Sequence, residues 1–175
     1  MTIRLCKIAL VAAVALFLFI VVLNNAFFDY ASNYGFVEHV LAMDSLFSGE
    51  SQVWRALRDP TPGDGSWWFY HAFYVTIILW EAVSCALCTY GAFQLFQQRR
   101  APVVAFRAAK KFAVLGLTLS MLQWFVAFIT VGGEWFLMWQ SSTWNGQDAA
   151  FRMFACIGIV LLFLAAADGE NESDA

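Results

Sequence analysis

The sequence predicts an all-α protein, a bundle of four transmembrane helices with both chain termini on one side of the membrane. Hydrophobic residues make up 61% of the chain and charged residues only 13%, which is far from the composition of a soluble domain. A hydrocarbon core about 30 Å thick needs roughly 20 residues of helix. Four apolar runs reach this length, at 8–28, 69–96, 112–131 and 149–167.

The length of each run indicates how it crosses the bilayer. The first reaches spanning length only by continuing through Asn24 and Asn25, and the fourth only by including Arg152. The second is longer than the hydrocarbon core, so we expect it to tilt or to protrude. The first run could instead be a cleaved signal peptide, but no small-x-small cleavage site follows Leu23. We therefore expect a retained helix.

The basic residues predict the orientation of the bundle. Seven of the ten Lys and Arg residues lie before the first run or between the second and third: Arg4, Lys7, Arg99, Arg100, Arg107, Lys110 and Lys111. The positive-inside rule places such residues in the cytoplasm. We expect cytoplasmic termini, a cytoplasmic connection at 97–111, and outward segments at 29–66 and 132–148.

The first outward segment, 29–66, contains a helical apolar stripe. Phe36, Val40, Met43 and Phe47 recur at spacings of four, three and four residues, which is typical of an amphipathic helix. A second short helix is expected from residue 51, with Trp54 buried, before the proline- and glycine-rich stretch 60–65 ends regular structure. We predict two short interfacial helices that cover the mouth of the bundle.

The second outward connection is rich in tryptophan. The Gly132-Gly133 pair is expected to end the third span, and the apolar stretch 135–139 that follows is too short to cross the membrane. We expect this stretch to be re-entrant or interfacial. Six of the eight tryptophans map to the outward side: Trp54, Trp67, Trp68, Trp135, Trp139 and Trp144. An aromatic belt accounts for most of them, and their excess also fits an outward docking surface.

Glu81 is the outstanding candidate for chemistry because it lies near the middle of the second run. A carboxylate at that depth is costly and normally faces the bundle interior. The third run offers a small and polar stripe that includes Ser120 and Gln123, and such stripes allow close helix contacts. We predict a buried polar seam in which Glu81, carrying a proton, meets Gln123, with Ser120 or a water nearby. The seam either fixes helix register or binds a proton or ligand.

Other polar residues are predicted at the outward mouth. Glu134 and Arg152 could form a salt bridge there, both could instead reach solvent or lipid headgroups, or Arg152 could capture an anion. His39 and His71 are expected to be interfacial hydrogen-bonding residues, because two separated histidines make a poor haem or metal site. We therefore predict no cofactor and no metal.

The four cysteines do not indicate a disulfide framework or a redox site. None of them lies in an outward segment, where an oxidising compartment would pair them. Cys85 and Cys88 have the C-x-x-C spacing but fall within an apolar helix, where burial disfavours a reactive thiolate. We expect them to act as small packing residues.

The acidic end of the chain, from Asp168, is predicted to be disordered. We expect one membrane domain over 1–168, with the outward cap segment at 29–66, and a disordered tail at 169–175.

No phosphate-binding loop, catalytic triad or nucleic-acid motif is evident. The basic connection at 97–111 is explained by topology and by anionic lipid.

Several sequence patterns together resemble a known family. They include Asn24-Asn25, Tyr34-Gly35-Phe36-Val37, Trp80-Glu81, and the stretch from Gly132 to Gln147. The chain resembles the bacterial family of predicted small integral membrane proteins of unknown function, which have four spans. The resemblance implies a bacterial inner-membrane location and supplies no catalytic residues.

Three functions fit these observations. The first is a non-enzymatic accessory or assembly subunit that docks another membrane component through its aromatic outward cap. The second is a small transporter or ligand-binding bundle that uses Glu81, Gln123 and Arg152. The third is a membrane enzyme with a quinone or lipid site. The expected partners are the lipid bilayer and another membrane protein, and no nucleic acid.

Overall fold

The fold is an all-helical bundle, as predicted. The computed structural model describes residues 1–47, 50–60 and 67–168. Its elements are α1 (Thr2–Leu23), the π-helical η1 (Asn24–Phe28), α2 (Tyr30–Ala42), the 3₁₀ helix η2 (Glu50–Arg55), α3 (Trp68–Gln97), α4 (Val103–Ala109), α5 (Lys111–Leu122), the π-helical η3 (Gln123–Trp135), the 3₁₀ helix η4 (Met138–Gln140) and α6 (Gln147–Ala165). Within the described residues the only β-type contact is an isolated bridge between Leu46 and Ser141.

Four helical stretches are long and apolar enough to cross a membrane: Thr2–Phe28, Trp68–Gln97, Val103–Trp135 and Gln147–Ala165. The third differs most from its prediction of 112–131. It begins within the basic connection, because no helix breaker follows Pro102 and Phe106 is fully buried. It also continues through Gly132 and Gly133, because η3 runs on to Trp135. The connection between the second and third spans is correspondingly short.

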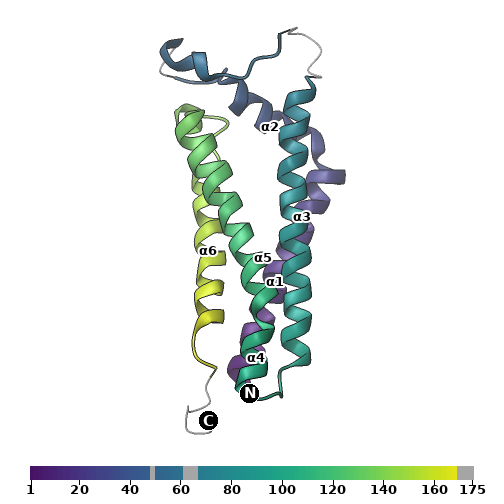
Figure 1. The fold of residues 1–175 in the computed structure, drawn as a ribbon. Coiled ribbons are helices and arrows are strands. Elements are labelled where there is room, and N and C mark those ends of the chain that lie inside the picture. Colours follow the sequence, from purple (N-terminus) through teal and green to yellow (C-terminus); the bar gives the residue numbers. More distant parts are fainter. Residues whose placement is uncertain (48–49, 61–66, 169–175) are drawn as a thin grey trace.

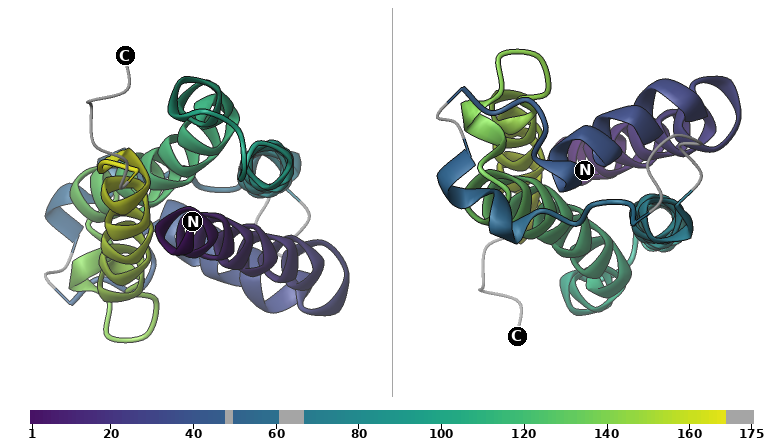
Figure 2. Two further views of the ribbon diagram at one scale, coloured as in Figure 1. Left: turned by 90° about the horizontal axis from the view of Figure 1, so that it is seen from below. Right: turned by 90° about the horizontal axis from the view of Figure 1, so that it is seen from above.

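The spans run up and down in sequence order, and α1, α3, α5 and α6 each pack on the next (Figures 1 and 2). The N-terminus and the end of α6 lie at one end of the bundle, which we name the terminal end. The opposite end carries α2, η2 and η4, and we name it the cap end. The two outward segments that the sequence predicts therefore share one end.

The contact between α3 and α5 is tight toward the terminal end. A Cβ added to Gly91 would lie 2.3 Å from the backbone nitrogen of Ala113, and one added to Gly116 would lie 2.7 Å from that of Cys88. Cys88 thus packs against Gly116, as expected for a small residue. Toward the cap end, α3 and η3 diverge (Figure 1). The bundle is consequently closed at one end and splayed at the other.

The splayed end is covered by the cap, which we define as residues 29–60 and 136–146. Backbone hydrogen bonds join its two parts, since the amide of Phe47 donates to the carbonyl of Gln140 at 3.1 Å. The apolar stripe of the first part is helical only as far as Ala42, because Met43 adopts a left-handed conformation with φ of 51°. Phe47 lies beyond the end of the helix and is exposed, and Trp54, which was predicted to be buried, is exposed as well. Residues 61–65 of the predicted proline- and glycine-rich stretch lie outside the described residues.

Candidate functional site

The centre of the bundle holds a buried polar node around Glu81. Its side chain is 2% exposed, and each carboxylate oxygen accepts one amide hydrogen bond. Gln123 Nε2 donates to Oε1 at 3.1 Å, and Asn25 Nδ2 donates to Oε2 at 2.8 Å. The structure thus contains the predicted contact between Glu81 and Gln123 and adds Asn25 from a third helix. Whether Glu81 carries a proton stays a prediction.

Both amide donors lie where a helix changes from α to π geometry. Asn25 belongs to η1, and Gln123 is the first residue of η3. π-Helical turns are rare and are frequently found at functional sites. Asn25 was missed as a partner, although two consecutive amides inside an apolar run are a usable signal, because such groups need hydrogen-bond partners in a membrane.

One helical turn toward the terminal end, two serines lie in the same seam. Three contacts fix the register of the antiparallel helices α3 and α5: Glu81 with Gln123, Cys88 with Gly116, and Gly91 with Ala113. In this register Ser84 lies opposite Ser120. Both serines are fully buried, and neither hydroxyl has a hydrogen-bond partner among the described residues; the same holds for Gln123 Oε1. Ser120 therefore lies beside the node, as predicted, but is not bonded to it.

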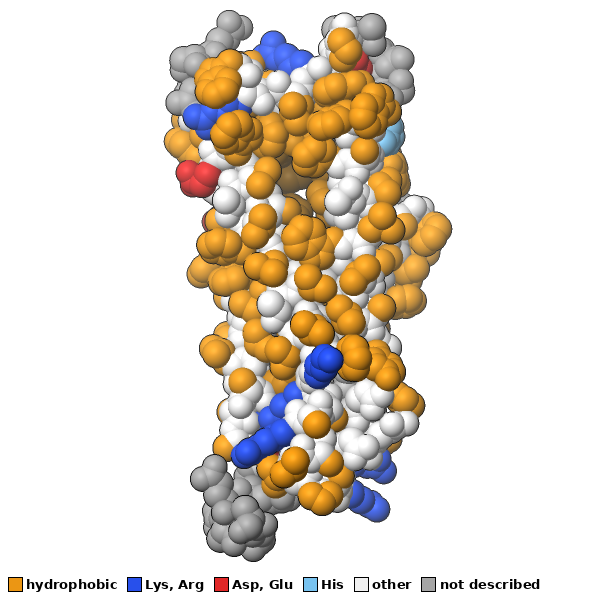
Figure 3. Space-filling view, viewed as in Figure 1, with side chains coloured by type: hydrophobic (Ala, Val, Ile, Leu, Met, Phe, Trp, Pro, Cys, Tyr) orange, Lys and Arg blue, Asp and Glu red, His pale blue; other side chains and the backbone are white. Residues whose placement is uncertain are grey.

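A separate cavity of about 230 Å³ lies between the node and the cap. It is lined by residues of α3, of η3 and of the cap: Phe36, Val37, Val40, Leu41, Phe73, Thr76, Ile77, Trp80, Val126, Ala127, Phe128, Val131, Gly132, Phe136 and Met138. Figure 3 shows a recess ringed by hydrophobic side chains just below the cap, on the side of the bundle. Its walls are almost entirely apolar, since the Thr76 hydroxyl is bonded to the carbonyl of Ala72 at 2.8 Å.

The cavity does not extend to Glu81. Neither Glu81 nor Gln123 lines it, whereas the neighbouring Trp80 does. The Nε1 of Trp80 donates to the carbonyl of Leu119 at 2.9 Å. A transport route from this cavity through Glu81, which would require a polar passage, therefore finds no support in the described residues. The cavity and the polar node are two distinct features.

The two histidines lie in different parts of the cap end. The ring of His71 stacks on Tyr34, with ring centroids 4.2 Å apart, and its Nδ1 lies 2.9 Å from the hydroxyl of Tyr30. His39 stacks on Trp144 with centroids 4.5 Å apart and contacts Asp44 at 2.8 Å. Both histidines form hydrogen bonds, and their position at the membrane interface stays a prediction. Burial, and then the nearby charge of Glu38, raises the pKa of Tyr34 to about 12.

The predicted salt bridge between Glu134 and Arg152 is absent from the described part of the chain. Arg152 Nε instead donates to the carbonyl of Asp148, one turn earlier in its own helix, at 3.3 Å. The Glu134 side chain is exposed, and its backbone carbonyl accepts a hydrogen bond from Arg55 at 3.3 Å. Arg152 is exposed as well, so the two side chains agree with the alternative in which each reaches the surroundings of the bundle instead of its partner.

Trp135 and Trp139 form an exposed aromatic group with two residues of the first part of the cap. Trp135 meets Trp54 with ring centroids 6.3 Å apart, and Trp139 meets Phe47 at 6.2 Å. Arg55 lies over both Trp54 and Trp135, at 5.6 and 5.4 Å from their ring centroids. All four rings are exposed, so the cap presents an apolar surface around one cation.

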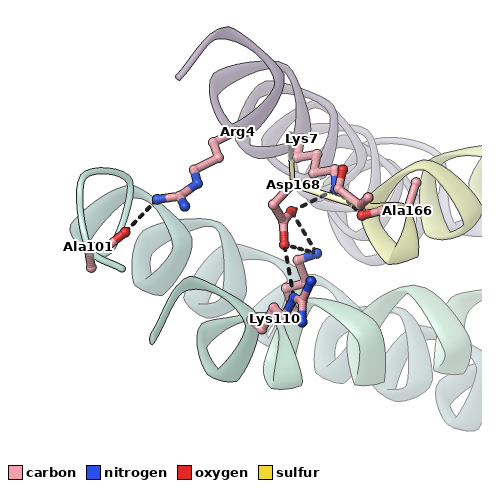
Figure 4. Close-up of polar contacts among 8 residues, drawn as sticks. Arg4, Lys7, Ala101, Lys110, Ala166 and Asp168 are labelled. Carbon is pink, nitrogen blue, oxygen red and sulfur yellow. Dashed lines mark hydrogen bonds and ion pairs between the residues drawn. The ribbon is translucent and has the colours of Figure 1, made fainter. Parts of the chain in front are cut away.

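The terminal end contains an ionic cluster that the sequence did not indicate. Lys7 Nζ contacts Asp168 at 2.8 Å and also donates to the carbonyls of Ala166 and Ala167 (Figure 4). Lys110 contacts the same carboxylate at 2.8 Å, and Arg107 lies 3.8 Å from it. Arg4 Nη1 donates to the carbonyl of Ala101 at 2.6 Å. We name Lys7, Lys110 and Asp168 the ionic clasp.

The clasp changes the predicted role of Asp168. This residue was expected to begin the disordered tail, whereas it is only 4% exposed and binds two lysines. Burial opposes its charge, but the hydrogen bonds from Lys110 and Lys7 outweigh burial and hold the pKa of Asp168 below its usual range. Residues 169–175 of the predicted tail lie outside the described residues.

The described residues contain no cluster of three or more His, Cys, Asp or Glu side chains that could hold a metal ion. The features capable of chemistry are thus the polar node, the apolar cavity and the ionic clasp. The first can bind a small polar species or a proton, the second an apolar group, and the third fastens the end of α6 to α1 and α5.

Comparisons with known proteins agree with this architecture. A search of the curated proteins and a search of the solved structures each gave no match. A family model, described as "predicted small integral membrane protein", matches residues 3–167, which is nearly the whole chain. The chain therefore belongs to this family of small integral membrane proteins (DUF2165), and its four spanning helices are those of an integral membrane protein.

Proposed function

We propose that this protein is a non-enzymatic membrane protein that holds the apolar chain of a membrane molecule in the cavity beneath its cap. The observation that carries the proposal is the cavity itself, about 230 Å³ in volume and lined almost wholly by apolar side chains. Apolar cavities of about 150 Å³ stay dry and bind apolar molecules as small as benzene. A larger cavity that meets the bilayer at its side suits an acyl or isoprenoid chain.

The position of the recess favours a ligand that arrives through the lipid. It opens on the side of the bundle, between the diverging α3 and η3 (Figures 1 and 3). A ligand from water would instead have to pass the cap, where Phe136, Leu137 and Met138 are buried. Glu81 does not line the cavity, so the walls offer no acid or base for a reaction on the ligand. Binding rather than catalysis is therefore proposed.

A photoreactive lipid tests this proposal directly. The purified protein, in vesicles that contain a phospholipid with a diazirine on its acyl chain, is irradiated and digested, and the labelled peptides are identified. We expect labelling of cavity residues such as Val131 and Phe73. Ala127→Leu fills the cavity and should reduce this labelling several-fold. Ala86→Leu, an equal change at an exposed position of α3, is the control. Labelling that is unaffected by Ala127→Leu would contradict the proposal.

A second candidate function is the docking of another membrane component, as an accessory or assembly subunit. The supporting observation is the exposed group of Phe47, Trp54, Trp135 and Trp139 around Arg55. Interfaces are enriched in aromatic residues and arginine. Co-purification after extraction in mild detergent tests this function. A Trp54→Ala, Trp139→Ala double variant should lose the partner, and recovery of the wild type as a lone monomer would count against docking.

The proposed location is the bacterial inner membrane, with the terminal end in the cytoplasm. The support is the gathering of basic residues at the terminal end (Figure 3) together with the positive-inside rule. Reporter fusions after residue 175 and within 61–66 test the orientation. A reporter active only in the cytoplasm should work at the first position and fail at the second.

A further inference from the structure

The polar node around Glu81 contains, in the described part of the chain, a carboxyl group and two neutral amides but no cationic side chain. Glu81 accepts hydrogen bonds only from the neutral amides of Asn25 and Gln123, and among the described residues no cationic side chain contacts it. A buried carboxylate without a cationic partner is strongly disfavoured, and such groups normally bind a proton or a metal ion. The node therefore requires a positive charge that the described side chains do not supply.

The same region contains three buried oxygens that lack partners. They are Gln123 Oε1 and the hydroxyls of Ser84 and Ser120. In membrane helices a serine hydroxyl commonly bonds to a carbonyl of the preceding turn, but neither of these does. Buried polar groups are nearly always hydrogen-bonded, so three orphan oxygens within one helical turn of an uncompensated carboxylate indicate a missing ligand.

We propose that Glu81, Gln123, Ser84 and Ser120 bind one small monovalent metal cation, with Na⁺ as the fitting ion. A proton on Glu81 would remove the charge but leave the three oxygens unpaired. A water would pair the oxygens but leave the charge. A proton and a water would both be needed to meet the two requirements, whereas one cation meets them alone, and carboxylate, amide carbonyl and hydroxyl oxygens are the ligands of hard cations. One carboxylate balances one positive charge, which favours a monovalent ion.

The layer of α3 and α5 in which the ion would lie consists of small, buried side chains. Large side chains would close the layer between Glu81–Gln123 and Cys88–Gly116, but both residues of that layer are serines. Below it, the Gly116 contact with Cys88 closes the seam, since an added Cβ would lie 2.7 Å from Cys88 Sγ. The ion would thus be held between the amide of Gln123 and this closed contact.

Polar groups lead from the node toward the cap end. The hydroxyl of Tyr74 donates to the backbone carbonyl of Asn25 at 3.0 Å. The ring of Tyr30 lies 4.9 Å from that of Tyr74, and its hydroxyl meets His71 at 2.9 Å. These groups lie on the cap-end side of the node, and none of them lines the apolar cavity.

Sodium-dependent stability and direct ion binding test the site. The full-length protein in detergent is unfolded thermally in NaCl or in equal concentrations of choline chloride, and ²²Na⁺ binding is measured at equilibrium. We expect Na⁺ to raise Tm above its value in choline, because a ligand that binds only the folded state stabilises it. We also expect one bound ion per chain.

Variants separate this site from other effects. Glu81→Gln should abolish the response to Na⁺. If that variant does not fold, Ser84→Ala and Ser120→Ala each remove one oxygen and should weaken Na⁺ binding by about tenfold or more, the loss that even outer-shell changes produce at metal sites. Thr89→Val, on an exposed position of α3, should bind Na⁺ normally. Ala127→Leu should also bind it normally, which distinguishes this site from the proposed lipid cavity.

Three results would contradict the proposed Na⁺ site. Equal stabilisation by Na⁺ and choline with no bound ²²Na⁺ would exclude the site. Stabilisation by acid alone, without any Na⁺ effect, would assign the missing charge to a proton. Retention of full Na⁺ affinity in both serine variants would also reject the proposed ligand set.

Discussion

Two buried carboxyl groups, Asp168 and Glu81, are held in opposite ways. Asp168 lies at the terminal end and is bound by two lysines, of which Lys7 is 1% exposed. Glu81 lies near the middle of α3 and is bound only by the amides of Asn25 and Gln123. Both side chains are almost inaccessible, yet only one has a countercharge from the protein.

The difference indicates different roles. Asp168 joins the end of α6 to α1 and α5, so its ion pairs complete the fold at the point where the helices end. Glu81 connects three helices, but the centre of the contact has hydrogen-bond acceptors without donors among the described residues. Unpaired buried acceptors destabilise a protein where the dielectric constant is low. A buried carboxylate with a structural role is paired with cationic side chains of the protein. A buried carboxylate that lacks such partners is a candidate binding group. The experiments below test this contrast.

The largest effect is expected for Asp168→Asn. The substitution leaves Lys7 buried with its charge unpaired, and breaking a buried ion pair costs about 3–5 kcal/mol. Because Lys7 keeps the carbonyls of Ala166 and Ala167 as acceptors, we expect a loss of roughly 2–4 kcal/mol in the free energy of unfolding, measured by denaturant titration in detergent. A loss no larger than that of an exposed Asp→Asn variant would contradict the structural role of the clasp.

Acid should weaken the clasp without a mutation. The pKa of Asp168 is lower in the folded protein than its usual value, so the stability that its charge provides is fully present above about pH 4 and is lost as the pH falls through the lower, folded pKa. The wild type should therefore lose more stability than Asp168→Asn between pH 5 and the acid limit, as followed by thermal unfolding. Parallel pH curves for the two proteins would show that the carboxylate contributes nothing.

A smaller effect is expected for Asn25→Ala, which removes one of the two donors to Glu81. The carboxylate oxygen then loses its only hydrogen bond from the described residues, and an unsatisfied buried polar group costs about 1–3 kcal/mol. The free energy of unfolding, measured without Na⁺, checks this value. Asn24→Ala, one residue earlier in the same π-helical segment, is the matched control. An equal loss in both variants would assign the effect to η1 rather than to Glu81.

The smallest effect is expected for Asp44→Asn at the cap end. Its contact with His39 joins two side chains that are 38% and 46% exposed, and an exposed pair contributes at most about 1 kcal/mol even when both groups are charged. The loss in the free energy of unfolding should also shrink as salt is added. A loss comparable to that of Asp168→Asn would remove the distinction between buried and exposed carboxylates.

The contrast also separates what could be predicted from what could not. The meeting of Glu81 with Gln123 follows from two helical stripes that each repeat at three- and four-residue steps. The pairing of Lys7 with Asp168 joins residues 161 positions apart, and it depends on where α1 and α6 end and how they tilt. Hydropathy runs locate helix ends only to within several residues, as the early start of α1 at Thr2 and of the third span at Val103 illustrates.

The sequence by itself determined the membrane class, the four spans, the gathering of basic residues near the terminal end and the polar seam between the second and third spans. These features are encoded locally, by apolar length and by helical periodicity. Only the tertiary structure decided the ionic clasp, the third helix that brings Asn25 to Glu81, and the cavity beneath the cap. Each of these depends on how separate helices diverge or converge, which is set by the packing of glycine, serine and aromatic side chains across the whole bundle rather than by any one segment.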